Sequence, residues 1–177
     1  MEDLMLTIPV NQTDHILGPA TAKVAVVEYG DFECPYCRQA YGAMKVVVNR
    51  YDGRIKFVFR HFPLTAWHPN AELAAEAAEA AGAQHKFWPM YDLLFEHQHN
   101  LKLDALRRYA AMLELDPARF DNDLNDHIYL QRVREHQDGG IKSQVRSMPA
   151  FFVNGELQDV TFGMEHLEAA IDRALRS

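Results

Sequence analysis

The chain has 177 residues, 48% of them apolar and 24% charged, with a formal net charge of −7 at pH 7. These values are typical of one folded domain with a well-buried core and leave no room for two independent domains. The negative charge argues against a nucleic-acid partner, because binding to a phosphate backbone requires clustered lysine and arginine.

The same sequence lacks signals for a membrane. No apolar run approaches the length of a membrane span, so we expect a protein that is not embedded in a membrane. Residues 1–10 have neither the basic region nor the long apolar stretch of a signal peptide. We therefore expect a cytoplasmic protein, or an extracytoplasmic one if a leader was removed before residue 1.

The first predicted strand follows about twenty residues that we expect to be irregular. Residues 23–29 form a nearly continuous apolar run rich in β-branched side chains, the pattern of a strand covered on both faces. Residues 30–33 turn the chain, a helix follows to about residue 51, and a second strand covers residues 54–62. This order predicts a βαβ unit with its site at the carboxyl end of the first strand.

The middle of the chain is predicted to be helical and its end to return to the sheet. A helical block of about eighty residues is too long for a loop, so we expect a subdomain packed on the sheet. Gly139-Gly140 is expected to break or bend the last of its helices, and Asn154-Gly155 predicts a type I′ hairpin turn. The predicted helices cover residues 71–81, 88–97, 103–113, 117–137 and 164–175, and the predicted strands cover residues 150–153 and 157–162.

Cys34 and Cys37 are the two cysteines of the chain and lie three positions apart, so no structural disulfide framework can exist. At the start of a helix, the sulfur of Cys34 lies beside unpaired N–H groups and the positive end of the helix dipole, which favour the thiolate. Such a setting lowers a cysteine pKa to between about 3.5 and 7.5. We expect Cys34 to be the exposed attacking group, and Cys37 to be covered, less acidic and responsible for resolving the mixed disulfide.

Half of a zinc site is the alternative interpretation of this pair. Structural zinc needs four ligands, and the chain has no second Cys-x-x-Cys and no His-x3–5-His set to complete them. The spacing of His61 and His68 fits no common structural site. We therefore predict no metal site, and we expect the helical histidines to face solvent. These are His85, His97, His99, His127 and His136.

Two motifs carry a family resemblance. Residues 31–37, DFECPYC, resemble the active-site signature of DsbA-like thiol–disulfide oxidoreductases, and residues 147–155, SMPAFFVNG, resemble their cis-proline loop and the hairpin after it. Residues 59–64, the alanine-rich helix and residues 86–88 resemble a cytoplasmic-type branch, whose domains occur alone or appended to sodium/proton antiporters. The resemblance runs from about residue 16 onward.

The resemblance implies the fold. It predicts an α/β thioredoxin fold with an all-helical subdomain inserted after the second strand, which agrees with the order of elements above. The implied divisions are an N-terminal extension over residues 1–20, a thioredoxin-like domain over residues 21–64 and 147–177, and the inserted helical subdomain over residues 65–146.

The resemblance also implies a substrate site. The family's peptide bond before Pro149 is cis, and its loop lies against the cysteine pair, so the Met148 backbone is expected to pair with a substrate strand over Cys34. Pro35 and Tyr36, between the cysteines, are expected to contact the substrate as well. Many members have Thr or Val in place of Met148, a difference that bears on redox potential and substrate preference. The alternative is an ordinary trans proline at the start of an edge strand.

Glu28 interrupts the first apolar strand six residues before Cys34, where the family and its thioredoxin relatives carry a buried acid. A desolvated carboxylate has a raised pKa and can accept the proton of Cys37 during resolution. The alternative is a solvated glutamate at a strand end. Lys56, Arg60 and His61 on the neighbouring strand are candidate partners of Glu28, and the sequence does not choose among them.

The expected reaction is disulfide exchange with protein or peptide thiols and disulfides, through a mixed disulfide on Cys34 and with a redox partner protein. No cofactor is expected beyond the Cys34–Cys37 pair. The Pro-Tyr dipeptide between the cysteines resembles that of glutaredoxins and indicates a middling potential, which leaves the direction open. Two alternatives remain: a reductase in which Cys34 forms a mixed disulfide with glutathione, and a non-enzymatic, redox-responsive binding or regulatory domain.

Overall fold

A five-stranded sheet forms the centre of the computed structural model, which describes residues 4–177. Its strand order is β1-β3-β2-β4-β5, with β2 and β3 parallel and the other neighbours antiparallel. The strands are β1 (Ile16–Leu17), β2 (Val24–Gly30), β3 (Ile55–His61), β4 (Ala150–Val153) and β5 (Glu156–Gln158).

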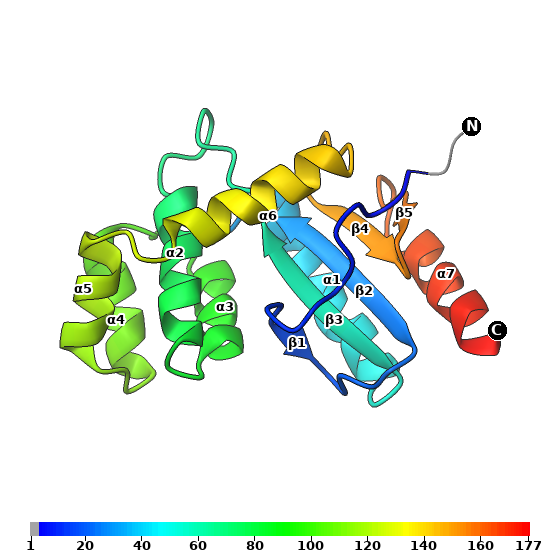
Figure 1. Cartoon of the computed structure of the whole chain (residues 1–177), viewed down its shortest axis with the longest axis horizontal. Helices are drawn as coiled ribbons and strands as arrows, with labels where there is room; N and C mark the ends of the chain where they lie inside the picture. The colour runs from blue at the N-terminus through cyan, green and yellow to red at the C-terminus, as the bar shows by residue number, and fades with distance from the viewer. Residues whose placement is uncertain (1–3) are drawn as a thin grey trace.

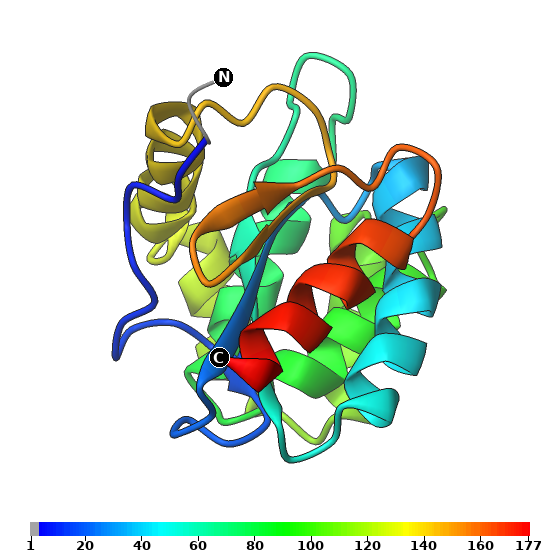
Figure 2. The ribbon, with the colours of Figure 1, turned by 90° about the vertical axis from the view of Figure 1, so that its right-hand side faces the viewer.

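Helices cover both faces of this sheet. Helices α1 and α7 lie on one face, while α6 and the N-terminal segment cross the other (Figure 2). Helices α2 to α5 stand together beside the sheet (Figure 1). The helices are α1 (Pro35–Arg50), α2 (Ala71–Gly82), α3 (Phe87–Glu96), α4 (Leu103–Met112), α5 (Pro117–Asn125), α6 (Leu130–Lys142) and α7 (Glu165–Arg176). No helix of residues 4–177 combines the length and the apolar character needed to cross a membrane.

The predicted α/β class and the βαβ and ββα units are confirmed. Strand β2 is buried along almost its whole length because helices cover both of its faces, as its continuous apolar run predicts. Helices α2–α6 follow β3 and precede β4, which is the predicted place of the helical block. The residue boundaries between a thioredoxin-like domain and this block stay a prediction.

The N-terminal segment is more ordered than predicted. Residues 16–17 form β1 against β3, although the first twenty residues were expected to be irregular. Asp14 and Arg60, both buried, form an ion pair at 2.8 Å. Arg60 also donates hydrogen bonds to the carbonyl oxygens of Ile8 and Pro9. These long-range bonds hold the segment across the sheet.

The predicted helix over residues 117–137 is wrong in its extent. It is divided into α5 and α6, and His127 between them has a left-handed backbone with φ 51°. The expected break at Gly139-Gly140 is also wrong, because both glycines lie inside α6. A Cβ at Gly140 would lie 2.6 Å from the Phe62 ring, so the glycines let α6 approach the sheet closely. Strand β5 is shorter than the predicted strand over residues 157–162.

Candidate active site

The two cysteines lie where β2 ends and α1 begins. Cys34 is the N-cap residue of α1, with extended backbone angles of φ −76° and ψ 123°, and Pro35 occupies the first turn, where its missing N–H has no cost. Both cysteines are free thiols. Cys34 keeps 4% of its surface exposed and Cys37 none. Cys34 is thus the more exposed of the two cysteines, as predicted, but its exposed surface is much smaller than expected. Only this small part of the Cys34 surface is open to a substrate.

The pKa of Cys34 is lowered to about 6. The largest cause is the hydrogen bond that the Cys37 thiol donates to the Cys34 sulfur, and burial opposes it. The backbone N–H groups of Cys37 and Tyr36 lower the pKa further, whereas the charge of Asp31 raises it. The helix start therefore contributes as expected, but the neighbouring thiol contributes more.

Cys37 has the opposite character. Burial is the largest of the causes that raise the pKa of the Cys37 thiol well above its ordinary value. The hydrogen bond to Cys34 and the charge of Glu28 raise this pKa further. The backbone N–H of Asp31 donates to the Cys37 sulfur at 3.4 Å, which opposes these effects. Cys37 therefore holds its proton at neutral pH and needs a base before it can attack.

Glu28 is completely buried, which excludes the solvated position at a strand end. Within residues 4–177, neither of its carboxylate oxygens has a hydrogen-bond partner. Burial, and next the charge of Cys34, raise the pKa of Glu28 well above its ordinary value. The neighbouring strand supplies no partner: Arg60 pairs with Asp14, and His61 pairs with Glu79.

The third expected partner, Lys56, also points elsewhere. Its ammonium group donates to the carbonyl oxygen of Ala20 at 3.1 Å. The idea that a basic residue of the second strand pairs with Glu28 is therefore wrong for all three candidates. A buried carboxyl without a counter-ion prefers its neutral form, which makes Glu28 a group that can exchange a proton.

The peptide bond between Met148 and Pro149 is cis. Both residues line a groove of about 1060 Å³ that also includes Tyr36, whereas Pro35 is exposed and lies outside the groove lining. Tyr36 is 70% exposed and Phe162, which also lines the groove, is 94% exposed. The structure therefore brings Met148, Pro149 and Tyr36 together. The Phe162 side of the groove carried no sequence signal, because it comes from a loop after β5.

Asp31 holds the turn before the cysteines, a role that the sequence analysis missed. Its buried carboxylate accepts hydrogen bonds from the backbone N–H groups of Glu33 at 2.7 Å and Leu64 at 2.8 Å. His68 Nδ1 lies 2.8 Å from the same carboxylate. Three partners satisfy a buried charge that would otherwise be costly, and they fix the loop after β3 beside Cys34.

The helical block holds the same turn from the other side. The side-chain amide of Gln98 donates to the carbonyl oxygens of Phe32 and Cys34, both at 2.8 Å. Glu33 accepts bonds from the backbone and side chain of Asn70. These contacts position the cysteine loop between the sheet and the helices. No local pattern could reveal Gln98, because it is more than sixty positions from its partners.

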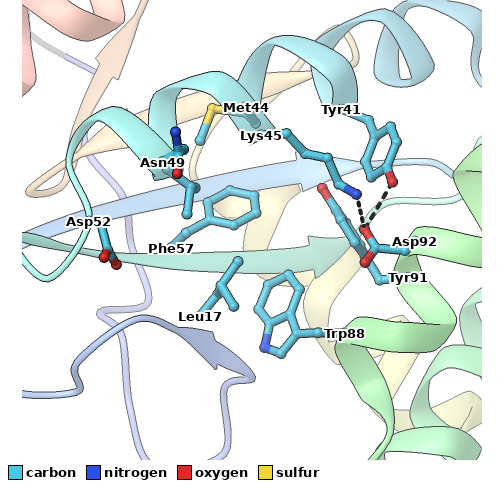
Figure 3. A pocket seen from close by; sticks show the side chains of 11 residues that line it. Leu17, Tyr41, Met44, Lys45, Asn49, Asp52, Phe57, Trp88, Tyr91 and Asp92 are labelled. Carbon is cyan, nitrogen blue, oxygen red and sulfur yellow. Dashed lines mark hydrogen bonds and ion pairs between the residues drawn. The ribbon is translucent and has the colours of Figure 1, made fainter.

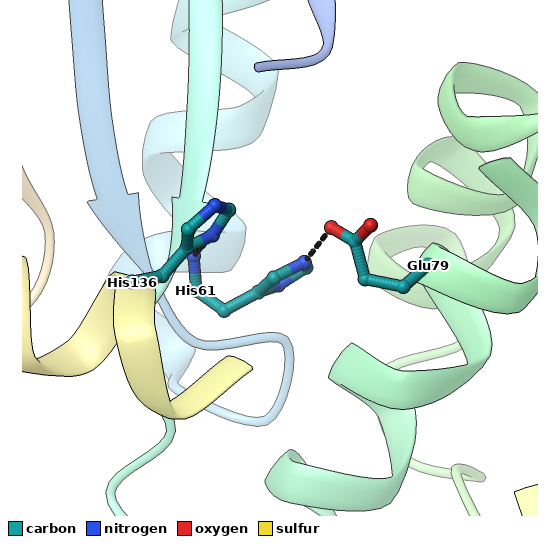
Figure 4. Close-up of side chains that lie close together, drawn as sticks. All are labelled: His61, Glu79 and His136. Carbon is teal, nitrogen blue, oxygen red and sulfur yellow. Dashed lines mark hydrogen bonds and ion pairs between the residues drawn. The ribbon is translucent and has the colours of Figure 1, made fainter. Parts of the chain in front are cut away.

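A second buried polar cluster joins β3 to α2 and α6 (Figure 4). His61, Glu79 and His136 place possible ligand atoms within 4.8 Å of one another. However, Glu79 already contacts His61 at 2.8 Å on one oxygen, and on the other His15 at 2.9 Å and Arg132 at 3.0 Å. The Arg132 charge opposes a cation there, so the cluster is better described as a hydrogen-bond network.

His136 corrects the prediction that the helical histidines face solvent. Its Nδ1 accepts a hydrogen bond from the backbone N–H of His61 at 3.2 Å, and the two rings stack with centroids 5.3 Å apart. Burial first, and then His61, lower the pKa of His136 to about 2. His136 is therefore a neutral acceptor inside the network and not a solvated side chain.

Comparison with known proteins places this geometry in a family. The family model described as thioredoxin matches residues 10–173, and the chain belongs to this family. Among solved structures, a thioredoxin-like oxidoreductase from Silicibacter pomeroyi has a TM-score of 0.83 at 25% identity, covering 94% of this chain and 95% of that one.

Two further solved structures show the same fold. BdbD from Bacillus subtilis has a TM-score of 0.87 at 22% identity, covering 99% of this chain and 100% of that one. The thiol-disulfide exchange protein alpha-DsbA2 from Wolbachia pipientis has a TM-score of 0.81 at 17% identity, covering 92% and 88%. The predicted DsbA-like resemblance is confirmed, and the family supports a thiol–disulfide oxidoreductase.

Curated relatives add a different context. The Na(+)/H(+) antiporter NhaA 1 of Salinispora arenicola is 46% identical over 172 residues, which cover 97% of this chain and 26% of the relative. The chain thus spans about a quarter of the length of that protein. The antiport activity in that name is an activity of the whole relative.

Proposed function

We propose that the chain exchanges disulfides with protein or peptide substrates through a mixed disulfide on Cys34. The pKa of about 6 carries this proposal, because it makes most of Cys34 thiolate at pH 7. The thiolate attacks one sulfur of the substrate disulfide, a new sulfur–sulfur bond forms, and the other substrate sulfur leaves as a thiolate. Substrate thiols would be oxidised by the reverse sequence.

Resolution of the mixed disulfide needs a second thiolate. Glu28 must first lose its own proton, because burial favours its neutral form. The Glu28 carboxylate then takes the proton of Cys37, and the Cys37 thiolate attacks the Cys34 sulfur. The second substrate sulfur leaves with the electron pair, and a Cys34–Cys37 disulfide remains. The pair itself therefore carries both electrons, and the proposal uses no other redox group.

Substrate placement follows from the groove beside Cys34. The Met148 backbone would pair with an extended substrate segment, and Pro35 and Tyr36 would contact it near the cysteines. Exposed Tyr36 and Phe162 supply apolar contact area in the lining of the groove. A redox partner protein that restores the pair would use the same opening. The cytoplasmic location stays a prediction.

The test is a redox titration of the purified protein in glutathione buffers, with the ultraviolet absorbance of the Cys34 thiolate followed against pH. We expect a reversible Cys34–Cys37 disulfide and a thiolate midpoint near pH 6. A midpoint near the ordinary value of about 8.5, with no disulfide formed, would refute the proposal. Cys37→Ser distinguishes the glutathione alternative, because only a glutathione-linked reductase would keep much of its turnover in that variant.

A further inference from the structure

A pocket lies under α1, on the side of the sheet that holds Glu28. It has a volume of about 410 Å³, with an apolar wall that includes Phe57 and Trp88. Tyr91 of α3 forms part of the same wall, near Asp92 and Lys45 (Figure 3). The pocket therefore connects the interior of this face with solvent.

Tyr91 and Glu28 share this face of the sheet. In the parallel register, Glu28 lies opposite Phe59, and the Phe59 and Tyr91 ring centroids are 5.1 Å apart. A Cβ at Gly30 would lie 3.2 Å from a Glu28 oxygen and 2.5 Å from the Phe59 ring, which places the carboxyl beside that ring. Phe59 is thus the common neighbour of the acid and the phenol.

The electrostatics agree with this placement. Burial first, and then the charge of Glu28, raise the pKa of Tyr91 well above its ordinary value. Asp92, Tyr41 and Cys37 act in the same direction. Tyr91 therefore stays a neutral phenol, which can donate one proton and accept another at the same time. Its pKa is affected by both Glu28 and Cys37, the two groups between which a proton moves when the mixed disulfide is resolved.

The two groups differ in their access to solvent. Both Glu28 carboxylate oxygens are buried and have no hydrogen-bond partner within residues 4–177. The Tyr91 hydroxyl makes no hydrogen bond within the same residues either, but Tyr91 lines the pocket and keeps 5% of its surface exposed. Beyond it, Asp92 accepts a hydrogen bond from Tyr41 at 2.9 Å and pairs with Lys45 at 3.2 Å.

We propose that Tyr91 is a proton-relay residue that connects Glu28 with water in the pocket formed by Phe57, Trp88, Lys45 and Asp92. The inference rests on the proposed function, in which Glu28 gains the proton of Cys37. Burial favours the neutral form of Glu28, so its carboxyl must lose a proton before it can gain that of Cys37. The carboxyl rotates toward the phenol and gives its proton to the Tyr91 oxygen, while Tyr91 gives its own proton to a pocket water. Glu28 is then a carboxylate, Tyr91 stays neutral, and no electron moves.

The test follows the resolution step in single turnover. The full chain carrying a fluorescent peptide as a mixed disulfide on Cys34 is mixed with buffer of chosen pH, and peptide release is recorded by stopped flow. Tyr91→Phe should slow release by about tenfold or more, since positioned proton transfer contributes factors of this size or larger. It should also change the pH profile and increase the solvent deuterium isotope effect. Imidazole, a small buffer that can enter the pocket, should restore part of the rate.

Two controls separate the relay from packing. Tyr109→Phe removes a phenol hydroxyl that donates to the carbonyl oxygen of Asn100 and does not line this pocket, so its rate should stay near that of the unmodified chain and should not respond to imidazole. If Tyr91→Phe does not fold, 3-fluorotyrosine at position 91 keeps the ring and lowers the phenol pKa, which should shift the pH profile without a change in thermal unfolding. Combining Glu28→Gln with Tyr91→Phe should add no further loss.

The possible outcomes are distinct. An unchanged rate and isotope effect in Tyr91→Phe, with normal exchange by the unmodified chain, overturns the relay alone. A slower rate that is equal at every pH and unaffected by imidazole also overturns it, because that pattern indicates packing. Absence of exchange in the unmodified chain instead overturns the proposed function.

Discussion

Two buried glutamates on neighbouring parts of this molecule behave in opposite ways. Glu79 lies among His15, His61 and Arg132, and its pKa is lowered well below the ordinary value because hydrogen bonds to the two histidines outweigh the effect of burial. Glu28, on the other face of the sheet from α6, has no partner within residues 4–177, and burial raises its pKa. Burial is common to both, so the partners decide the charge.

This difference separates a structural carboxylate from one suited to proton transfer. A carboxylate held by several donors stays ionised and ties elements together, and removing it leaves buried partners without a counter-charge. A carboxyl without partners exchanges a proton at the cost of lower stability in its ionised form.

The first prediction concerns Glu79→Ala. It leaves Arg132, His15 and His61 without their acceptor, so we expect the free energy of unfolding to fall by about 3–5 kcal/mol. Urea unfolding followed by circular dichroism measures this change. The surface variant Glu114→Ala is the control and should change stability by about 0.5 kcal/mol or less. A loss of that small size in Glu79→Ala would contradict the structural role.

The second prediction concerns Glu28→Gln. It removes the proposed base for Cys37, and we expect resolution of the mixed disulfide to slow by about a hundredfold, within the range of general base catalysis. Formation of the mixed disulfide, which depends on Cys34, should change much less. Stopped-flow measurement of both steps distinguishes them. Equal slowing of both steps would show that Glu28 acts on the cysteine loop as a whole.

The third prediction concerns the pH dependence of stability. Glu28 has a raised pKa in the folded state, so its stabilising protonation is complete below the unfolded value of about 4.3 and is lost as pH rises through the folded value. Glu28→Gln should therefore gain stability relative to the unmodified chain as pH rises. Glu79 has a lowered pKa, so its contribution is present above about pH 4.3 and is lost on acidification.

Unfolding curves measured from acid to alkaline pH check both signs. The stability difference between the unmodified chain and Glu79→Gln should shrink as pH falls, which is opposite to the trend for Glu28→Gln. Parallel trends in the two variants would mean that burial alone governs these carboxyl groups.

The fourth prediction concerns the thiol that lowers the pKa of Cys34. Cys37→Ala removes the largest cause, so the thiolate midpoint of Cys34 should move upward from about 6 by about one unit. Cys37→Ser keeps a hydroxyl donor and should shift the midpoint less. Ultraviolet titration of the thiolate measures both variants. An unchanged midpoint in Cys37→Ala would assign the low pKa to the helix N–H groups instead.

Local sequence patterns predicted the elements that support the redox site. The continuous apolar run of β2, the proline after Cys34 and the three-residue spacing to Cys37 act within a few residues of one another, so propensity and helix geometry determine them. For the same reason, the sequence predicted the turn into α1 and the hairpin that follows Pro149. The place of Glu28 in an apolar strand predicted a buried carboxyl, with a solvated strand end as the alternative that the structure excludes.

Contacts between distant residues could not be predicted in this way. His15 and Glu79 are 64 positions apart, and Gln98 reaches Cys34 across a similar distance. For the same reason, the sequence did not predict strand β1, the break between α5 and α6, or the position of Gly140 inside a helix. Each depends on which surface packs against the segment.

Local spacing and apolar periodicity therefore specify the α/β order, the place of the cysteine pair and the acid in the strand before it, and these features could be predicted from the amino-acid sequence. Which acidic and basic side chains lie in contact depends on how the separate helices and strands pack. Packing of α1 and α3 on the face of the sheet that holds Glu28 left this acid without a partner within residues 4–177 and placed Tyr91 at the wall of a pocket, because local sequence does not specify the distances between separate elements.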